Sequence, residues 1–184
     1  MVSIILDEHI LLRSYQPADA PALFRAVNAS RKALRPWLNW VDLTITPQHS
    51  LQYIQHALAG EHEQRSLSLG VFRHQEIIGG LGMHAWDQRL RKAEVGYWVA
   101  RDWQRQGIGT RAVSRFLDFL FGRLQLNKVE LHIVAGNEAS KQFALSLGAT
   151  PEGCLRQSVM RHGKLEDLLV FGILAEEWKA RERS

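Results

Sequence analysis

The spacing of hydrophobic residues changes several times along the chain, and each change marks a predicted element. Apolar positions three and four apart predict helices in five segments: from residue 17, over 30–40, from 47 to about 60–65, over 108–124 and from 137 to 148. Alternating apolar and polar positions predict strands over 10–13, 67–74, 77–86, 93–100 and 129–133, and on both sides of a turn at 161–164. This order predicts an α/β fold, in which a mixed sheet of about seven strands is flanked by helices.

Composition places the chain among ordinary globular proteins. It has 184 residues, 46% of them hydrophobic, and no linker-like, repetitive or low-complexity stretch, so we expect a single domain over residues 1–184. Cys154 is the only cysteine and cannot form an internal disulfide, which fits a reducing compartment. No apolar run reaches the length of a membrane span, and residues 1–8 do not resemble a secretory signal. We therefore expect a cytoplasmic protein without membrane association.

The charge balance restricts the partners. Lys and Arg number 23 against 19 acidic residues, a net charge of +4 that is modest for nucleic-acid binding but suits a small anionic ligand if the charge is local. Eight histidines include His49, His56 and His62 in one helical stretch, but none has HExxH spacing and no second cysteine is available. We expect neither a nucleic-acid partner nor a bound metal.

Residues 95–110 carry the strongest chemical signal. A predicted strand ends, a polar turn follows, and Gly107 and Gly109 lie where a helix begins. The first turn of a helix has unpaired N–H groups and the positive end of the macrodipole, and glycine lets a ligand approach the backbone. Three arginines add positive charge near the same end: Arg101, Arg105 and Arg111. The segment predicts a phosphate site.

Two other interpretations apply to the glycines taken alone. Residues 107–112 match the dinucleotide pattern GxGxxA, but in that motif the first glycine directly follows the first strand of a parallel sheet, whereas six or seven residues intervene here. The second interpretation is a glycine-rich turn with solvated arginines. A P-loop is absent, because no Gly-Lys is followed by Ser or Thr.

A longer pattern favours the phosphate site. Residues 104–109 fit the motif Q/R-x-x-G-x-G/A, and the chain resembles the GNAT superfamily of acetyl-CoA-dependent N-acetyltransferases over nearly its whole length. Residues 93–99, 136–140 and 147–153 resemble the ribosomal-protein, RimJ/RimL-type branch. The resemblance implies the GNAT fold, with a mixed and mostly antiparallel sheet, and acetyl-CoA as cosubstrate.

The resemblance also implies where the coenzyme binds. Backbone amides from Arg105 to Thr110 are expected to hold the diphosphate, and the strand edge of residues 97–99 is expected to pair with the pantetheine arm, as an added strand would. The implied cofactor-binding residues are Tyr97, Trp98, Val99, Gln104, Arg105, Gln106, Gly107, Ile108, Gly109, Thr110 and Asn137.

Acetyl transfer to an amine requires a proton acceptor, because only the free base attacks the thioester. Glu94 is our choice, since it should lie on the opposite strand face from Val95; the alternative is a structural carboxylate paired with Arg91 or Lys92. Ser140 matches a serine that RimL-type enzymes are thought to use near the thiol; the alternative is capping of the helix start.

Other positions depart from the family pattern or carry no assigned role. The tyrosine that many GNAT enzymes use as general acid is replaced by Ala144, and the glutamate proposed as the base in RimL falls at Val159. A coenzyme-binding regulatory module without turnover therefore stays open as an alternative. Glu130 and His132 should share a strand face and could form an ion pair there, but we assign them no chemistry.

The acceptor is predicted from the acid–base cost. An α-amine has a pKa near 7.8 and a lysine near 10.4, so deprotonating lysine at neutral pH costs about 3.5 kcal/mol more. This favours a protein N-terminal α-amine, as in the ribosomal-protein serine or alanine enzymes, with a small-molecule amine as the alternative. Trp37 and Trp40, beside Arg31, Lys32 and Arg35, are the expected acceptor anchors, and core packing is their alternative role. If exposed, these arginines would favour an acidic acceptor.

The family often dimerises, so a homodimer is also expected.

Overall fold

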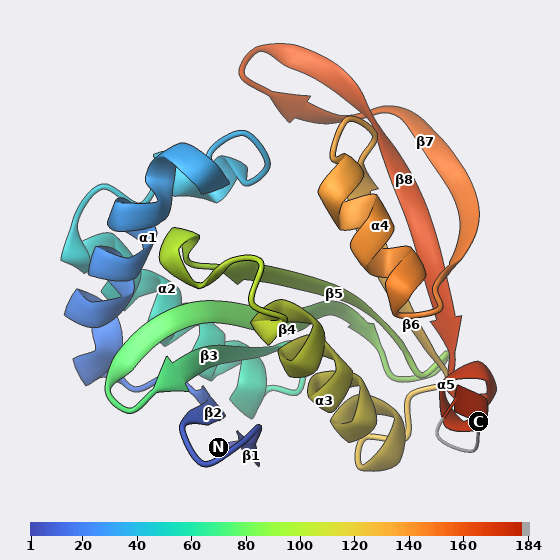
Figure 1. The fold of residues 1–184 in the computed structure, drawn as a ribbon, viewed down its shortest axis with the longest axis horizontal. Helices are drawn as coiled ribbons and strands as arrows, with labels where there is room; N and C mark the ends of the chain where they lie inside the picture. Colours follow the sequence, from blue (N-terminus) through green and yellow to red (C-terminus); the bar gives the residue numbers. More distant parts are fainter. Residues whose placement is uncertain (182–184) are drawn as a thin grey trace. The chain divides into compact units, whose positions relative to one another are not determined.

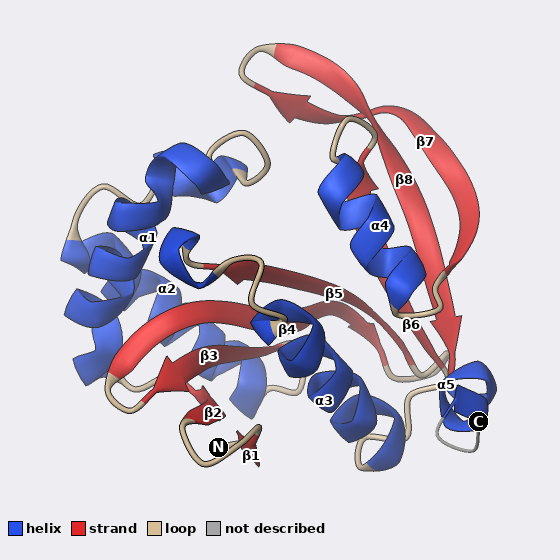
Figure 2. Ribbon diagram, viewed as in Figure 1, coloured by secondary structure: helices blue, strands red, loops and turns tan. Residues whose placement is uncertain are grey.

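The structure is a computed structural model that describes residues 1–181 (Figure 1, Figure 2). Its strands are β1 (Ser3–Ile5), β2 (Ile10–Ser14), β3 (Leu67–Arg73), β4 (Glu76–Asp87), β5 (Lys92–Val99), β6 (Lys128–Val134), β7 (Thr150–Arg161) and β8 (Lys164–Leu174). Its α-helices are α1 (Ala20–Leu34), α2 (Pro47–His62), α3 (Ile108–Gly122), α4 (Glu138–Ser146) and α5 (Ala175–Arg181). Short 3₁₀ helices are η1 (Pro17–Asp19), η2 (Asn39–Asp42) and η3 (Arg101–Trp103).

Contacts divide the described chain into two units. The first comprises Met1–His84 and Tyr97–Phe116, and the second comprises Ala85–Gly96 and the described residues from Leu117 onward. Strands β4 and β5 and helix α3 continue from one unit into the other.

The first unit is built on antiparallel strands in the order β1-β2-β3-β4. Helices α1 and α2 contact each other beside these strands (Figure 1). They pack around a core that includes Tyr15, Leu23, Val27, Ile54 and Phe72, each no more than 4% exposed. The apolar positions of α1 recur at helical spacing, so they form one face toward this core.

Helix α2 begins where its sequence predicts. Thr46 is extended and its side chain accepts a hydrogen bond from the His49 amide, while Pro47 occupies the first helical position. An N-cap of this kind satisfies an amide that the helix itself leaves without an acceptor. The prediction of Thr46 as N-cap is confirmed.

The second unit contains the parallel pair of the sheet. Residues 92–94 of β5 run parallel to residues 128–130 of β6, and β6 pairs antiparallel with β8, which pairs antiparallel with β7. His162 and Gly163 both have positive φ at the turn between β7 and β8, as a two-residue hairpin requires. Alternation along β6 buries Val129, Leu131 and Ile133 on one face. The predicted mixed, mostly antiparallel sheet and its final hairpin are confirmed.

Several element predictions were wrong in detail. The described chain has eight strands instead of about seven, because β1 was missed, and α5 was missed as well. The separate helix expected over residues 30–40 does not form: α1 runs through to Leu34 and ends at Arg35, before Pro36, and only the short η2 follows. Arg35 is still in helical conformation, but Pro36 has no N–H and cannot donate the next hydrogen bond of the helix, which explains this end.

A membrane span was not expected, and among residues 1–181 we find no helix with the length and apolar character needed to cross a bilayer.

Candidate active site

The turn after β5 is held by its own side chains and by β4. The Ala100 amide donates to the Ile78 carbonyl at 2.9 Å. Gln104 Nε2 donates to the Val99 carbonyl at 3.0 Å, and Gln106 Nε2 donates to the Asp102 carbonyl at 2.9 Å. These bonds fix the path of the backbone between the end of β5 and the start of α3.

Six consecutive amides at the start of α3 have no protein acceptor. Within residues 1–181, none of the N–H groups of residues 105–110 donates a hydrogen bond to another protein group, and the first bonded amide is that of Arg111, which donates to the Gly107 carbonyl at 3.0 Å. Arg105, Gln106 and Gly107 are exposed. Unpaired amides at the positive end of a 15-residue helix are suited to an anion. The segment therefore fits a diphosphate.

The two glycines of the motif have different surroundings. Gly107 has φ +73°, and a Cβ added there would meet no atom within 4 Å, so this backbone faces open space. A Cβ on Gly109 would lie 3.3 Å from Cγ2 of Val99. Helix α3 therefore packs closely on β5 at Gly109, and the expectation that both glycines admit a ligand stays a prediction.

The three arginines near this helix end are not equivalent. Arg101 Nε lies 2.8 Å from Asp102 Oδ1, and Arg111 pairs with Asp7. The pKa of the Asp7 carboxyl is lowered, first by the His9 amide and then by the Arg111 guanidinium. In the described part of the chain Arg105 has no ion-pair partner, and it too has positive φ, at 60°. Arg105 is thus the arginine that is free to meet an anion.

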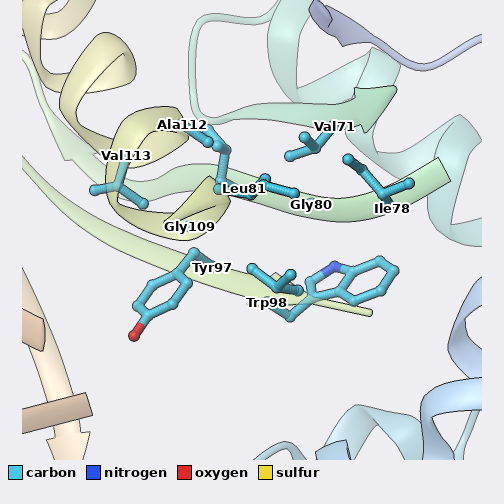
Figure 3. Close-up of a pocket in the computed structure, with 11 residues that line it drawn as sticks. Val71, Ile78, Gly80, Leu81, Tyr97, Trp98, Gly109, Ala112 and Val113 are labelled. Carbon is cyan, nitrogen blue, oxygen red and sulfur yellow. The ribbon is translucent and has the colours of Figure 1, made fainter. Parts of the chain in front are cut away.

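A small apolar pocket lies beside the same helix start, within the first unit (Figure 3). Val71, Ile78, Gly80 and Leu81 line it from β3 and β4, Tyr97, Trp98 and Val99 from β5, and Ile108, Gly109, Ala112 and Val113 from α3. Tyr97 and Trp98 point away from each other in Figure 3, as successive residues of a strand do.

The end of β5 offers a strand edge. Its parallel register with β6 stops at the pair Glu94 and Glu130, although β5 continues to Val99. The Trp98 carbonyl lies toward Gly79 of β4, 2.6 Å from where a Cβ on Gly79 would be. Neighbouring carbonyls of a strand point to opposite edges, so those of Tyr97 and Val99 point to the other edge, where the Val99 carbonyl already accepts from Gln104 Nε2. This arrangement is compatible with an extended ligand that carries amides.

The loop with the two predicted acceptor tryptophans contacts β5. Trp37 and Trp40 are each 37% exposed, and the Trp40 ring lies edge-on to the Trp98 ring with centroids 6.1 Å apart. Arg31 donates to the carbonyls of Val41 and Thr44. The tryptophans are therefore accessible at the surface and are not fully buried core residues.

Two arginines near this loop bond to its residues. Arg31 is engaged with loop carbonyls, and Arg35 Nε lies 2.8 Å from Asp42 Oδ1. Both side chains tie α1 to residues 41–44. Arg35 stays exposed, and the expectation that this group favours an acidic acceptor stays a prediction.

Glu94 belongs to the second unit, and its partner is a histidine. Glu94 Oε2 lies 3.1 Å from His132 Nδ1, and the other ring nitrogen, Nε2, lies 3.3 Å from Glu130 Oε2. Hydrogen bonding to Glu94, and then to Glu130, raises the pKa of His132 against the opposing effect of burial. The predicted contact of His132 with Glu130 is confirmed, whereas Lys92, named as an alternative partner of Glu94, bonds to Glu130 at 3.1 Å.

Sequence reasoning missed that His132 contacts Glu94. Alternation placed Glu130 and His132 on one face of their strand, but the contact also depends on the parallel register that sets Glu94 opposite Glu130. Strand alternation alone does not specify register, so no local signal could have found this pair.

Asn137 and Ser140 form the start of α4. Asn137 is the N-cap, and its Oδ1 accepts a hydrogen bond from the Ser140 amide at 3.1 Å. The alternative role proposed for Ser140, capping by its hydroxyl, is corrected, because Asn137 supplies the cap. Glu94, Asn137 and Ser140 lie in the second unit, and the other predicted site residues lie in the first.

Comparisons with known proteins identify the family of this chain. A family model described as Acetyltransferase (GNAT) domain matches residues 9–150. YdaF of Bacillus subtilis (strain 168), named as a candidate ribosomal N-acetyltransferase, is 28% identical over 99% of this chain and 100% of its own. The ribosomal-protein-serine acetyltransferase of Escherichia coli (strain K12) is 21% identical over 92% of this chain and 94% of its own.

A solved structure extends the likeness to a coenzyme complex. Mycobacterium smegmatis RimJ in complex with CoA-disulfide matches with a TM-score of 0.83 and 26% identity, over 95% of this chain and 90% of that one. The family model covers most of the chain. The chain belongs to the GNAT acetyltransferase family and is an N-acetyltransferase with acetyl-CoA as cosubstrate.

Proposed function

We propose that this enzyme acetylates the α-amine of a protein N-terminus, of the serine or alanine type found in ribosomal proteins. The observation that carries the proposal is the match, over nearly the full length of both chains, to relatives named for ribosomal acetylation. The acid–base cost supports it, because an α-amine loses its proton near neutral pH far more easily than a lysine.

The coenzyme supplies an acetyl thioester as the acyl donor. The amides of residues 105–110 hold its diphosphate, with Arg105 as the nearby unpaired cation. Gln104 fixes the turn through the Val99 carbonyl, and the edge of Tyr97, Trp98 and Val99 receives the pantetheine amides. Asn137 contributes from the start of α4. The absence of protein acceptors for the amides of residues 105–110 supports this assignment.

The protein residues then manage two protons. Glu94 accepts the proton of the acceptor amine, directly or through water, so that the free base can attack. Ser140 provides a hydrogen bond or proton to the departing thiolate; its amide is already satisfied by Asn137, which fixes the first turn of α4 around it. Trp37 and Trp40 hold the acceptor chain on the loop that Arg31 anchors.

An acceptor panel tests the proposal. One peptide has a free N-terminal serine, a second has a blocked N-terminus and one lysine, and the third acceptor is spermidine. Thiol release and mass mapping of the product should show acetylation of the free N-terminus at the highest kcat/KM. Preferred turnover of spermidine or lysine would overturn the α-amine assignment. Coenzyme binding without turnover of any acceptor would favour a regulatory module instead.

Glu94→Gln tests the proton acceptor. The variant should lower the rate most below pH 8, where the acceptor amine is largely protonated and needs a base. Glu76→Gln is the control, because Glu76 is an exposed strand carboxylate with no ion-pair partner in the described chain. An unaltered pH profile in Glu94→Gln would remove Glu94 from this role.

A further inference from the structure

One face of the β5–β6 pair consists of charged side chains. The parallel register sets Lys92 beside Lys128 and Glu94 beside Glu130, and His132 follows two residues later on the same face. The opposite face is apolar and buried, as Ala93, Val95, Val129 and Leu131 show. The charged residues are therefore a defined cluster on a rigid support and not scattered surface charges.

His132 is held by both ring nitrogens. Nδ1 lies 3.1 Å from Glu94 Oε2, and Nε2 lies 3.3 Å from Glu130 Oε2. A neutral imidazole has a single N–H and could donate to only one of these carboxylates, while the other would face a nitrogen lone pair. The imidazolium donates to both. This geometry therefore stabilises the charged ring.

Glu130 is itself fixed by two ammonium groups. Lys92 Nζ lies 3.1 Å from Glu130 Oε1, and Lys128 Nζ lies 3.2 Å from the same oxygen. These ammonium groups outweigh the effect of burial and lower the pKa of Glu130. Glu130 stays ionised through the neutral range and gives the ring a permanent anchor.

The remaining neighbours complete the set of groups around His132. From β7, Glu152 lies 2.6 Å from Lys128 Nζ and takes part of the charge of that lysine. The β8 residue paired with His132 is Val170, which carries no charge. These side chains form a linear set that runs from the lysines through Glu130 and His132 to Glu94.

We infer that His132 is a positioning residue that orients the Glu94 carboxylate for proton transfer from the acceptor amine. The inference rests on the proposed role of Glu94. The two bonds fix the plane of the His132 ring. The bond from the ring to Glu94 Oε2 then fixes the orientation of the Glu94 carboxylate, including its second oxygen. Orientation of a base in this way commonly changes rates by one to two orders of magnitude, about ten- to hundredfold.

The charge of the His132 ring should make the acetylation rate depend on pH. As pH rises through the pKa of His132, the ring loses its charge and keeps one donor, so Glu94 and Glu130 compete for it. Activity should therefore fall at high pH. In His132→Gln this alkaline limb should disappear, with kcat about tenfold lower near neutral pH and an unchanged KM for acetyl-CoA. His132→Lys should recover part of the rate and move the limb upward, because lysine titrates much higher.

Two further variants keep the test sharp. Glu130→Gln leaves the ring in place and removes the competing carboxylate, so the neutral ring can donate to Glu94 alone and the alkaline limb should weaken, whether or not the His132 variants fold well. His56→Gln is the control, since His56 is exposed on α2 and has no polar partner in the described chain. An alkaline limb that is the same in wild type, His132→Gln and Glu130→Gln would overturn the inference.

A readout without turnover separates this inference from the proposed function. Titration of the His132 ring by nuclear magnetic resonance should give a pKa that falls in both Glu94→Gln and Glu130→Gln and does not change in His56→Gln. If wild type acetylates no acceptor, the proposed function fails and the titration alone decides whether His132 holds Glu94. A ring pKa that is the same in wild type and in Glu94→Gln would refute the positioning role.

Discussion

At the scale of single residues, Gly107 and Gly163 form a matched pair. Both have positive φ, +73° and +77°, and an added Cβ would meet nothing within 4 Å at either position. Gly107→Asp and Gly163→Asp therefore impose the same kind of backbone strain. Only the carboxylate at residue 107 should face the diphosphate, so coenzyme Kd should rise at least about tenfold, or about 1.4 kcal/mol. Calorimetric titration measures it. Equal affinities in the two variants would refute the placement of the site.

His132 also links stability to pH. Its pKa is raised in the folded chain, chiefly by the hydrogen bond to Glu94, so the folded state binds the proton more tightly than the unfolded one. The stabilisation is fully present below the unfolded pKa of about 6.5 and is lost as pH rises through the raised value. His132→Gln should therefore destabilise the chain more at pH 5.5 than at pH 8.5, by about 1–2 kcal/mol at the lower pH. Denaturant unfolding at the two pH values measures this, and equal losses would contradict it.

Sequence reasoning at this scale found the amides but not the ion pairs. The unpaired amides of residues 105–110 follow from a local rule, because the first turn of any helix lacks acceptors. The partners of Arg31, Arg111 and His132 depend on segments 10 to 104 residues away or on strand register. No local pattern encodes such contacts.

At the scale of elements, Asn137 at the start of α4 has one observed role and one predicted role, and substitutions can separate the two. Its Oδ1 caps the helix, and its predicted second role is coenzyme binding. Asn137→Asp keeps the capping oxygen, whereas Asn137→Ala removes it and should cost about 1 kcal/mol. If Asn137 also binds the coenzyme through its amide nitrogen, Asn137→Asp should retain stability and weaken coenzyme affinity. Unfolding and binding curves for both variants distinguish these effects. Unchanged affinity in Asn137→Asp would leave capping as the role of this residue.

Elements with long periodic patterns were predictable, and short ones were not. Helix α2 has a cap, a proline at its first position and three turns or more of pattern, so its start was predicted correctly. Strand β1 has three residues with two exposed, and α5 has seven residues, which is too little for a periodic signal. The error over residues 30–40 arose because apolar spacing continued past Pro36, which ends the helix.

At the scale of the whole molecule, the predicted site residues are distributed over the sequences of both units. The amides of residues 105–110 and the end of β5 lie in the first, whereas Glu94, Asn137 and Ser140 lie in the second. Strands β4 and β5 and helix α3 each contribute residues to both units. The element in which a residue lies therefore does not tell whether it is a predicted coenzyme-binding or a predicted catalytic residue. The single domain and the homodimer stay predictions.

Coenzyme binding should stabilise the whole chain, because a ligand that binds only the folded state shifts the unfolding equilibrium. At 100 times Kd the gain is about 2.7 kcal/mol. For a chain of this size each kcal/mol raises Tm by about 2–4 °C, so a rise of about 5–10 °C is expected. Gly107→Asp should lose most of this rise at the same coenzyme concentration.

Hydrogen exchange locates the effect on the same samples. The amides of residues 105–110 are exposed or lack protein acceptors, so they should exchange rapidly in the free enzyme and become protected with coenzyme. The hairpin turn at Gly163 serves as the internal reference, since its exchange should not change. A Tm rise accompanied by protection elsewhere, with residues 105–110 still exchanging fast, would mean that the coenzyme binds at another site, because hydrogen-bonded amides cannot exchange at the rate of free ones.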